Sequence, residues 1–421
     1  MQICIFEDIN VNKLNPLVYA RPVYDLIAGT SSLKEKILSA YPSVMCSLHC
    51  RPYLEGIVKQ NNPNTFVNSI ESDECLFING RLIAPANLNE VIPLISGVDK
   101  VYVNGETVIA ARVSGKKLSY LKNYKRDLFE LLNFEGLQIE LVNSKTVQYP
   151  WELITANGKL IKDEFENIKS SKTKVTPVYK IYDGAHLIGK ENIFIGSGSI
   201  IKPGVVLDAS NGPIIIQEEV EIFPNAVIEG PVFIGKKSKI KSCASIYENV
   251  SIGHTCKVGG EVEESIILPY SNKQHAGFIG HSYLGSWVNL GADTNCSDLK
   301  NNYSNISVKI NHESINTGLQ FVGLIMGDHS KTGINTMLNT GTVAGFCSNI
   351  FGSGFPSKFI PSFSWGGSDG FEEYDLNKAI EVARKVYQRR NIIMTGTDEI
   401  IFRKIFELSE NERINLKAKV K

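Results

Sequence analysis

Aliphatic residues recur at every sixth position through the middle of the chain. A helix would bring apolar residues back after three and four positions, and an ordinary half-buried strand after two. A period of six indicates that the chain turns a corner after each short strand and returns one aliphatic side chain to a shared interior. This is the pattern of a hexapeptide-repeat parallel β-helix. Eight consecutive positions of the series carry a β-branched aliphatic residue: Ile216, Ile222, Ile228, Ile234, Ile240, Ile246, Ile252 and Val258.

The period continues on both sides of this run, with interruptions. We expect an earlier register through Ile188, Phe194, Ile200 and Val206, which an insertion at residues 210–213 ends. After the run, Glu264 stands where an aliphatic residue belongs, and the series resumes at Ile279, Leu284 and Leu290. A last series comprises Met326, Thr332, Leu338, Ala344 and Ile350. Loops leave a solenoid at such interruptions and often carry function, so the site is expected within residues 260–315.

The segments on either side of the repeats have other patterns. Residues 1–165 read as an α/β domain with strands at Ile3–Phe6, Cys75–Ile78 and Lys100–Val103. Ser31–Ala40 is predicted to be a helix, with Ser31 or Ser32 as its N-cap and Glu35 near the third position. Trp151–Phe165 is expected to be a connecting helix. Residues 166–180 are the predicted linker, centred on the Ser/Lys/Thr-rich stretch Lys169–Thr176.

We therefore predict a β-helix over residues 181–366 and a helical tail over residues 367–421. In the tail, Ala379, Val382, Val386 and Tyr387 fall at helical spacing, and Ile400–Phe406 continues a second helix. The tail is expected to cover an otherwise exposed end of the β-helix, as repeat folds require. The alternative is that it helps to bind a cofactor through Arg389 and Arg390.

Composition narrows the possible partners. The 421 residues include 44 basic and 44 acidic side chains, so no basic field predicts binding to nucleic acid. No stretch approaches 18 apolar residues, and the N-terminus lacks the basic start of a signal peptide, so no membrane partner is expected. The eight cysteines are scattered without a Cys-x-x-Cys pair and read as reduced thiols. We therefore expect a cytoplasmic protein.

Residues 271–294 combine a lysine, two histidines, an asparagine and aromatic residues. A histidine beside amide and cationic groups suits acyl transfer to an amine, because an imidazole with a pKa near neutrality can take the proton of the attacking amine. Lys273 and Lys300 are candidates for binding a phosphate as point charges. Backbone N–H groups or Asn289 are candidates for stabilising the oxyanion.

This segment resembles the acetyltransferase half of the bifunctional glucosamine-1-phosphate N-acetyltransferase/N-acetylglucosamine-1-phosphate uridyltransferase (GlmU-like) family. The family pattern is similar to S-K-A-x-H-L-x-Y-L-G-D-A-E-I-G-x-N-V-N-I-G-A-G-T. The resemblance places His275 on the catalytic histidine, Lys273 on the lysine before it and Phe278 on a tyrosine. Residues 288–294 match V-N-I-G-A-G-T, and residues 298–300 resemble the N-L-R that follows in archaeal relatives.

The chain also departs from the family pattern. Phe278 lacks the tyrosine hydroxyl, Trp287 replaces an amide, and the loop before His275 is short. The sequence of this region resembles a divergent branch of the family that is typical of Bacteroidetes-like genomes. That resemblance covers essentially the whole chain. His281 is the rival for the role of the base, although it stands one hexad further on. The plainest alternative is that both histidines are ordinary polar residues at coil corners.

A second alternative is a zinc enzyme. Trimeric left-handed β-helices resembling γ-carbonic anhydrases bind zinc through three histidines, and His254, His275 and His281 invite the comparison. In that family the paired histidines are five positions apart, whereas His275 and His281 are six apart. No matching pattern of carboxylate and arginine surrounds them.

The N-terminal domain departs further from its family. The glycine-rich loop L-A-A-G-x-G-T-R-M, whose backbone N–H groups would cradle nucleotide phosphates, is missing. The divergent branch has a run like Arg21–Val23 followed by a helix that contains Lys36, and we expect Arg21 and Lys36 to contact nucleotide phosphates. The strand that should end in G-D ends in Asn79-Gly80-Arg81, which leaves Asp8 as a weak candidate for binding Mg²⁺. Residues 149–157 resemble the P-W-D-L-L-x-A-N that joins the two halves in archaeal relatives.

The resemblance implies an α/β nucleotidyltransferase-like domain followed by a left-handed parallel β-helix with a helical tail. It implies acetyl transfer from acetyl-CoA to glucosamine-1-phosphate, then uridyl transfer from UTP with Mg²⁺, which makes UDP-N-acetylglucosamine for the cell envelope. It also implies a homotrimer. The alternatives are a sugar-1-phosphate nucleotidyltransferase whose β-helix serves only for assembly, an acetyltransferase with a degenerate N-terminal domain, and a purely structural β-helix.

Overall fold

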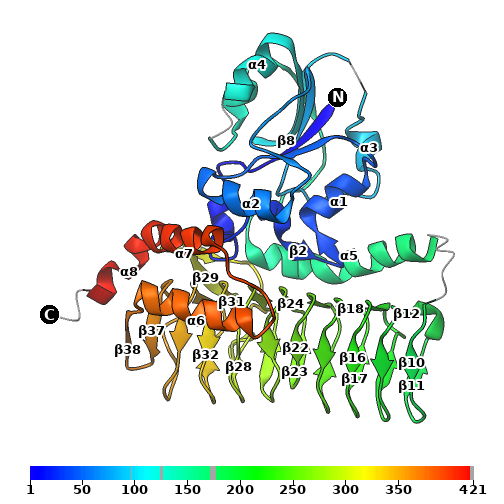
Figure 1. Cartoon of the computed structure of the whole chain (residues 1–421), viewed down its shortest axis with the longest axis vertical. Coiled ribbons are helices and arrows are strands. Elements are labelled where there is room, and N and C mark those ends of the chain that lie inside the picture. The colour runs from blue at the N-terminus through cyan, green and yellow to red at the C-terminus, as the bar shows by residue number, and fades with distance from the viewer. Residues whose placement is uncertain (96, 124–126, 171–176, 418–421) are drawn as a thin grey trace.

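The computed structural model describes residues 1–95, 97–123, 127–170 and 177–417. Figure 1 shows an α/β domain standing on the side of a long β-helix, with one helix lying along the junction between them. The predicted architecture, an α/β domain followed by a parallel β-helix and a helical tail, is confirmed. The stacking of the strands is consistent with the left-handed coil that the resemblance implies.

The N-terminal domain is built on a seven-stranded sheet of order β5-β4-β1-β6-β8-β7-β9. Its strands are β1 (Gln2–Phe6), β4 (Cys46–Leu48), β5 (Phe66–Val67), β6 (Glu74–Asn79), β7 (Lys100–Asn104), β8 (Thr107–Ser114) and β9 (Gln138–Leu141). Strands β5, β4, β1 and β6 run parallel, and β8 is antiparallel to both of its neighbours. The three strands predicted for this domain are therefore confirmed.

Short helices and a small hairpin complete this domain. They are the hairpin β2 (Ile27–Ala28) and β3 (Ser31–Ser32), the helices α1 (Leu33–Ser39), α2 (Glu55–Asn61), α3 (Leu88–Val91) and α4 (Gly115–Asn123), and the 3-10 turns η1 (Val11–Leu14), η2 (Val23–Asp25), η3 (Pro52–Leu54) and η4 (Leu131–Phe134). Ser32 caps α1 in a capping box with Glu35, as the sequence predicts. The connecting helix α5 (Pro150–Ser170) is longer than predicted and packs along the β-helix. Residues 171–176 of the predicted linker lie outside the described residues.

The β-helix has three faces, each a ladder of parallel strands. The first face contains β10 (Lys180–Ile181), β13 (Ile200–Ile201), β16 (Glu221–Ile222), β19 (Lys239–Ile240), β22 (Lys257–Val258), β25 (Asn272–Lys273), the bridge residue Asn289, β32 (Lys331–Thr332), β35 (Asn349–Ile350), β37 (Ser364–Gly367) and the antiparallel β38 (Gly370–Glu373). The second face contains β11 (His186–Ile188), β14 (Val206–Asp208), β17 (Val227–Glu229), β20 (Ser245–Ile246), β23 (Glu261–Glu263), β26 (Phe278–Gly280), β28 (Asn295–Cys296) and β33 (Met337–Leu338).

The third face and two insertions complete the coil. The third face contains β12 (Ile193–Ile195), β15 (Ile214–Ile216), β18 (Val232–Ile234), β21 (Val250–Ile252), β24 (Ile266–Ile267), β27 (Tyr283–Leu284), β31 (Ile325–Met326), β34 (Val343–Ala344) and β36 (Phe359–Ile360). A 3-10 turn, η5 (Lys190–Asn192), precedes β12, and a hairpin, β29 (Ser307–Ile310) and β30 (Glu313–Asn316), leaves the coil within the interval where the sequence predicts loops. We call the corner between the first and second faces the first corner, that between the second and third faces the second corner, and that between the third and first faces the third corner.

The hexad residues form the core of the coil as predicted from Ile216 onward. All eight residues of the long run are completely buried, and Ile279, Leu284, Leu290 and the last series are also buried. The prediction for the earlier register is wrong by one residue. Ile188 is 46% exposed, whereas Ile195, Ile201 and Leu207 point inward. Adjacent aliphatic pairs such as Ile200-Ile201 make either residue fit the period, so the sequence pattern alone does not choose between them.

The tail consists of α6 (Leu376–Gln388), α7 (Gly396–Leu408) and α8 (Glu410–Lys417). Helix α8 packs against β38, the last strand of the coil, and α7 reaches α2 of the N-terminal domain. Tyr387 of α6 stacks on Trp287 at the third corner with ring centroids 4.3 Å apart, and the other face of Trp287 stacks on Tyr270 at 4.2 Å. The unusual tryptophan therefore holds the tail helix against the coil. Among the described residues, no helix is long and apolar enough to cross a membrane.

Candidate active site

The residues predicted around His275 occupy a turn whose lysine is structural. His275 is exposed at the first corner. Lys273 lies buried beneath it, and its Nζ donates to the carbonyl oxygens of Gly259 and His275, each at 2.9 Å. Burial lowers the pKa of Lys273 to about 8. Lys273 therefore supports the turn that presents His275, and its ammonium faces backbone oxygens.

The other predicted substrate-binding residues are spread over three places. Phe278 is half-buried at the start of β26, where its N–H donates to Asn295 Oδ1 at 2.8 Å. Asn289 is exposed on the first face. Lys300 lies in the insertion and donates to the carbonyl oxygen of Asn305 at 2.6 Å. Within one chain these side chains do not converge on His275.

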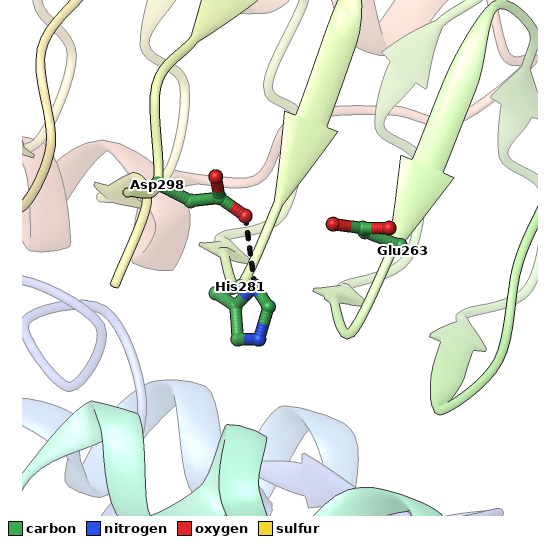
Figure 2. Close-up of side chains that lie close together, drawn as sticks. All are labelled: Glu263, His281 and Asp298. Atoms are coloured by element: carbon green, nitrogen blue, oxygen red, sulfur yellow. Dashed lines mark hydrogen bonds and ion pairs between the residues drawn. The ribbon is translucent and has the colours of Figure 1, made fainter. Parts of the chain in front are cut away.

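A different histidine has the environment of a catalytic base. His281 stands at the second corner, and its Nδ1 lies 2.8 Å from Asp298 Oδ2 (Figure 2). Phe321 stacks on the imidazole with ring centroids 5.0 Å apart. A carboxylate that accepts the Nδ1 proton fixes the tautomer and leaves Nε2 free to accept another proton. The structure thus gives the rival histidine the partner that a general base requires.

Glu263 is a second carboxylate beside the His281–Asp298 pair. Its carboxylate comes from the preceding coil, and the ligand atoms of Glu263, His281 and Asp298 lie within 4.8 Å of one another. Burial raises the pKa of Glu263, and the neighbouring Asp298 raises it further. Three groups of this kind could also bind a cation.

The three histidines considered as zinc ligands do not share a site within the described part of one chain. His254, His275 and His281 stand at three different corners of the coil.

Sequence reasoning did not assign a role to Asp298 or Glu263. The nearest signal was the slip of register at Glu264, which adjoins Glu263 and adopts a left-handed corner conformation with φ of 42°. The sequence gives no signal for Asp298 other than its position at the point where the insertion leaves the coil. Glu263 ends β23 and Asp298 follows β28, and these two strands flank β26, which precedes His281, so the three side chains meet at one corner.

The end of β1 is filled by buried ion pairs. Arg81, which is fully buried, donates to both oxygens of Asp8 at 2.8 and 2.5 Å, and Asn79 donates to Oδ2 at 2.9 Å. Glu7 pairs with Arg51 in the same way at 3.1 Å. A carboxylate with both oxygens engaged by an arginine does not fit a Mg²⁺ ligand in this conformation. The residues around Asp8 therefore do not support its predicted role as a Mg²⁺ ligand.

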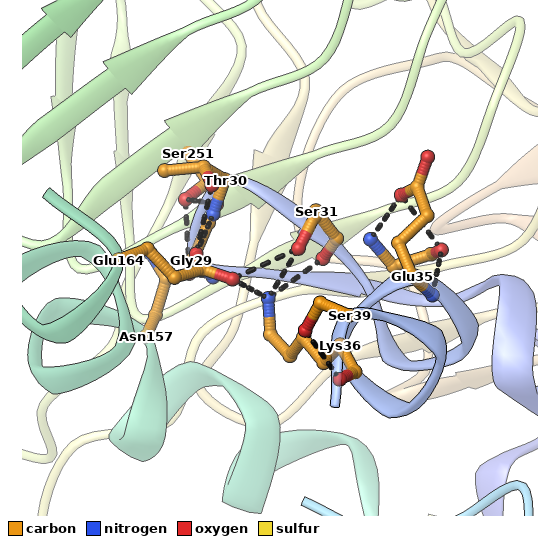
Figure 3. A network of polar contacts seen from close by, with 10 residues as sticks. Gly29, Thr30, Ser31, Glu35, Lys36, Ser39, Asn157, Glu164 and Ser251 are labelled. Atoms are coloured by element: carbon orange, nitrogen blue, oxygen red, sulfur yellow. Dashed lines mark hydrogen bonds and ion pairs between the residues drawn. The ribbon is translucent and has the colours of Figure 1, made fainter. Parts of the chain in front are cut away.

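The two cations predicted to bind nucleotide phosphates lie in ion pairs at or beside the junction between the domains. Arg21 makes a two-pronged pair with Asp328 of the β-helix and also donates to Ser286 Oγ at 3.1 Å. Lys36 pairs with Glu164 of α5 and donates to Ser31 Oγ at 2.9 Å (Figure 3). Both lie at the junction, where a cleft of about 610 Å³ opens between the N-terminal domain, the third corner and the tail; Arg21 lines this cleft.

Comparisons with known proteins find one family model and several relatives. Residues 3–173 match the family model described as sugar nucleotidyl transferase. The bifunctional sugar-1-phosphate nucleotidylyltransferase/acetyltransferase of Sulfurisphaera tokodaii is 32% identical over 146 residues, which cover 33% of this chain and 35% of that protein. The bifunctional protein GlmU of Methanococcus aeolicus is 28% identical over 247 residues, 58% of this chain and 47% of that protein.

Residues 3–173 are therefore similar to a sugar nucleotidyl transferase domain, and the two bifunctional relatives agree with the GlmU-like family that the sequence resembles. The family model and the Sulfurisphaera tokodaii protein are both named as transferases, in agreement with the predicted class of enzyme. The matched segment spans less than half of the length of each of these two relatives. A UDP-N-acetylglucosamine acyltransferase structure from Francisella novicida has 18% identity and a TM-score of 0.29 over 57% of this chain and 76% of that one, a likeness too low to add to the fold.

Proposed function

We propose that this protein makes UDP-N-acetylglucosamine in two steps, acetyl transfer from acetyl-CoA to glucosamine-1-phosphate and then uridyl transfer from UTP. The observation that carries the first step is the hydrogen bond between His281 and Asp298. It supports acid–base chemistry on the β-helix and so favours an enzyme over a coil that serves only for assembly.

In the proposed first step, His281 Nε2 takes a proton from the amine of the sugar as its nitrogen attacks the thioester carbonyl. Asp298 accepts the Nδ1 proton throughout and stabilises the imidazolium that forms. A C–N bond forms, the C–S bond breaks, and His281 returns its proton to the departing thiolate of coenzyme A. His275, which the resemblance marks as the base, remains the competing assignment.

The second step takes place in the N-terminal domain, where the sugar phosphate attacks the α-phosphate of UTP and pyrophosphate leaves. The family resemblance implies Mg²⁺ for this step, and Asp8, whose two oxygens are engaged by Arg81, does not fit as its ligand. The engagement of Asp8 by Arg81 favours a second candidate function, an acetyltransferase whose N-terminal domain no longer transfers a nucleotide.

We further propose a cytoplasmic homotrimer that acts on small molecules, with neither nucleic acid nor a membrane as partner. The support comes from the family resemblance and from the balanced charge of the chain. Sedimentation that gives a monomer mass would contradict the trimer.

The test is an incubation of purified protein with glucosamine-1-phosphate, acetyl-CoA, UTP and Mg²⁺, read by mass spectrometry. UDP-N-acetylglucosamine is the expected product. N-acetylglucosamine-1-phosphate alone would establish the second candidate function, and the absence of any acetylated product would overturn the acetyl step.

Substitution of each histidine, together with Asp298→Asn, decides which histidine is the base. We expect His281→Ala to lower the kcat of acetyl transfer by about 10²–10⁴-fold, and Asp298→Asn to lower it by a smaller factor. His275→Ala is the matched control and should stay near the wild-type rate. The reverse result would assign the base to His275. Loss of activity in both variants would mean that the two corners meet in one site, which requires neighbouring copies of the chain.

A further inference from the structure

The cleft of about 610 Å³ at the junction has a wall from each part of the chain. The N-terminal domain contributes the start of α1 and the end of α2, the β-helix contributes its third corner, and the tail contributes α7 and the end of α6. Helices α2 and α7 contact each other above the coil (Figure 1). The cleft is distinct from His281, which stands at the second corner. A ligand in it would touch all three parts of the chain.

The lining of this cleft carries an excess of negative charge. It contains four carboxylates and two cations: Asp25, Glu35, Asp328, Asp398, Arg21 and Lys34. Arg21 pairs with Asp328, and Lys34 pairs with Asp25 at 2.8 Å. Glu35 and Asp398 form no ion pair with a described residue. Because the whole chain has as many acidic as basic residues, this excess is local to the cleft.

Each of these two carboxylates caps a helix with one oxygen only. Glu35 Oε2 accepts from the N–H and the Oγ of Ser32 at 2.7 and 2.8 Å. Asp398 Oδ2 accepts from the N–H and the Oγ1 of Thr395, each at 2.7 Å. Neither Glu35 Oε1 nor Asp398 Oδ1 accepts a hydrogen bond from a described residue. A helix N-terminus offsets only about half of a negative charge, so each carboxylate leaves net negative charge on the cleft.

An unpartnered histidine lines the same space. His329 is 4% exposed, and its Nδ1 is buried without a hydrogen bond to a described residue. Burial lowers the pKa of His329 far below its usual value, so the imidazole stays neutral. A neutral imidazole has one nitrogen that accepts a hydrogen bond and one that donates, and leaving a buried polar atom unpaired is unfavourable. The histidine therefore offers a hydrogen-bond acceptor to a ligand.

Aromatic rings surround this imidazole. The ring centroids of Phe402 and Phe346 lie 4.8 and 5.7 Å from it, and those of Trp287 and Tyr387 lie 6.0 Å from it. All four rings line the cleft. Aromatic rings attract an ammonium group, whereas the carboxylates repel a phosphate. The lining thus matches an amine and does not match a nucleotide or a sugar phosphate.

We propose that the junction cleft binds an organic diamine or polyamine. Its ammonium groups pair with the free oxygens of Glu35 on α1 and Asp398 on α7, and one N–H is donated to His329. The hydrocarbon between the amines lies against the aromatic wall. The bound amine joins the N-terminal domain to the tail and so stabilises their packing on the coil. This site is independent of the two transfer reactions proposed above.

Direct binding to the purified full chain tests this inference. Calorimetry measures the Kd of spermidine, of butylamine, which has a single ammonium group, and of Mg²⁺. We expect spermidine to bind most tightly and to raise the melting temperature. The double variant Glu35→Gln/Asp398→Asn keeps both helix caps, because an amide oxygen accepts the same hydrogen bonds. It removes both charges and should raise the Kd of spermidine about tenfold or more.

Two further variants make the test specific. Asp375→Asn is the matched control, because Asp375 caps α6 outside the cleft and its loss of charge should leave the Kd unchanged. His329→Phe keeps an aromatic ring and removes the acceptor. It should weaken the binding of spermidine without lowering the melting temperature of the free protein.

Every outcome of these measurements supports or overturns the site. Spermidine that gives neither heat of binding nor a shift in the melting temperature of the wild type would overturn it. Equal Kd values in the wild type and the double variant would also overturn it. Equal affinities for spermidine, butylamine and Mg²⁺ would show that the carboxylates bind any cation, and would reject the assignment to a diamine or polyamine. Because these readouts measure binding alone, they remain valid if the protein transfers neither an acetyl group nor a nucleotide.

Discussion

At the scale of single residues, the role of each charged side chain depends on its partners. Lys273 and His275 are two positions apart in a segment that resembles a catalytic motif, yet the lysine is buried under backbone oxygens and the histidine is exposed. His281 resembles the motif less closely and has the carboxylate. A motif identifies residue types. Which histidine can act as a base depends on its hydrogen-bond partner, and for His281 that partner, Asp298, is 17 positions away in the sequence.

Lys273 gives a prediction about stability against pH. Its pKa is about 8 in the folded chain and 10.5 in its ordinary state, so the unfolded chain binds more protons between these values. The stability that this residue contributes is therefore complete above pH 10.5 and is lost as the pH falls through 8. The difference amounts to about 3 kcal/mol.

The measurement compares wild type with Lys273→Met, which cannot titrate. Between pH 8 and 10 the free energy of unfolding of the wild type should rise relative to that of the variant. A constant difference across this range would mean that the pKa of Lys273 is not lowered by burial.

At the scale of elements, the corners share a backbone conformation. At the first corner, Asn225, Cys243, Asp293 and Asn335 all have positive φ, between 53° and 63°, and a glycine takes the same place in other coils. This left-handed conformation crowds Cβ and is tolerated best by glycine and asparagine. The corners therefore explain the polar and glycine residues between the aliphatic hexads.

Asn335 tests this explanation, because it is exposed and its N–H donates to the carbonyl oxygen of Ala292 in the preceding coil. We expect Asn335→Val to destabilise the β-helix by about 1–2 kcal/mol, since a β-branched residue is strained at positive φ. Asn335→Gly should stay within about 0.5 kcal/mol of wild type. Denaturant midpoints measure both, and equal effects of the two variants would contradict the role of backbone strain.

At the scale of the whole molecule, ion pairs and packing join the N-terminal domain to the β-helix. The Arg21–Asp328 pair crosses between them with side chains 15% and 5% exposed, and Ser251 donates to the carbonyl oxygen of Gly29 at 2.7 Å (Figure 3). Helix α5 packs on both sides of this junction. The two halves are therefore expected to unfold together.

Arg21→Ala should weaken that coupling. It leaves the buried Asp328 without its cation, which costs about 3 kcal/mol or more, and scanning calorimetry should show the single transition separating into two. Lys34→Ala is the control, because it removes the Lys34–Asp25 ion pair, whose partners are 17% and 22% exposed and lie within one domain. It should lower the temperature of the unfolding transition without splitting that transition into two. A single transition in Arg21→Ala would contradict this role, and splitting in both variants would show that the effect is not specific to the Arg21–Asp328 pair.

The sequence by itself determined the β-helix, because burial of one side chain per strand imposes a period that no other fold requires. It also determined the first strands of the N-terminal domain and the cap of α1, which depend on neighbours within a few residues. Only the tertiary structure placed Asp298 against His281, joined Arg21 to Asp328 and brought Phe402 against His329. These contacts join residues 17, 307 and about 70 positions apart. Their meeting depends on how many residues each coil and insertion contains and on how the domains pack, which a local pattern of hydrophobic and polar residues does not encode.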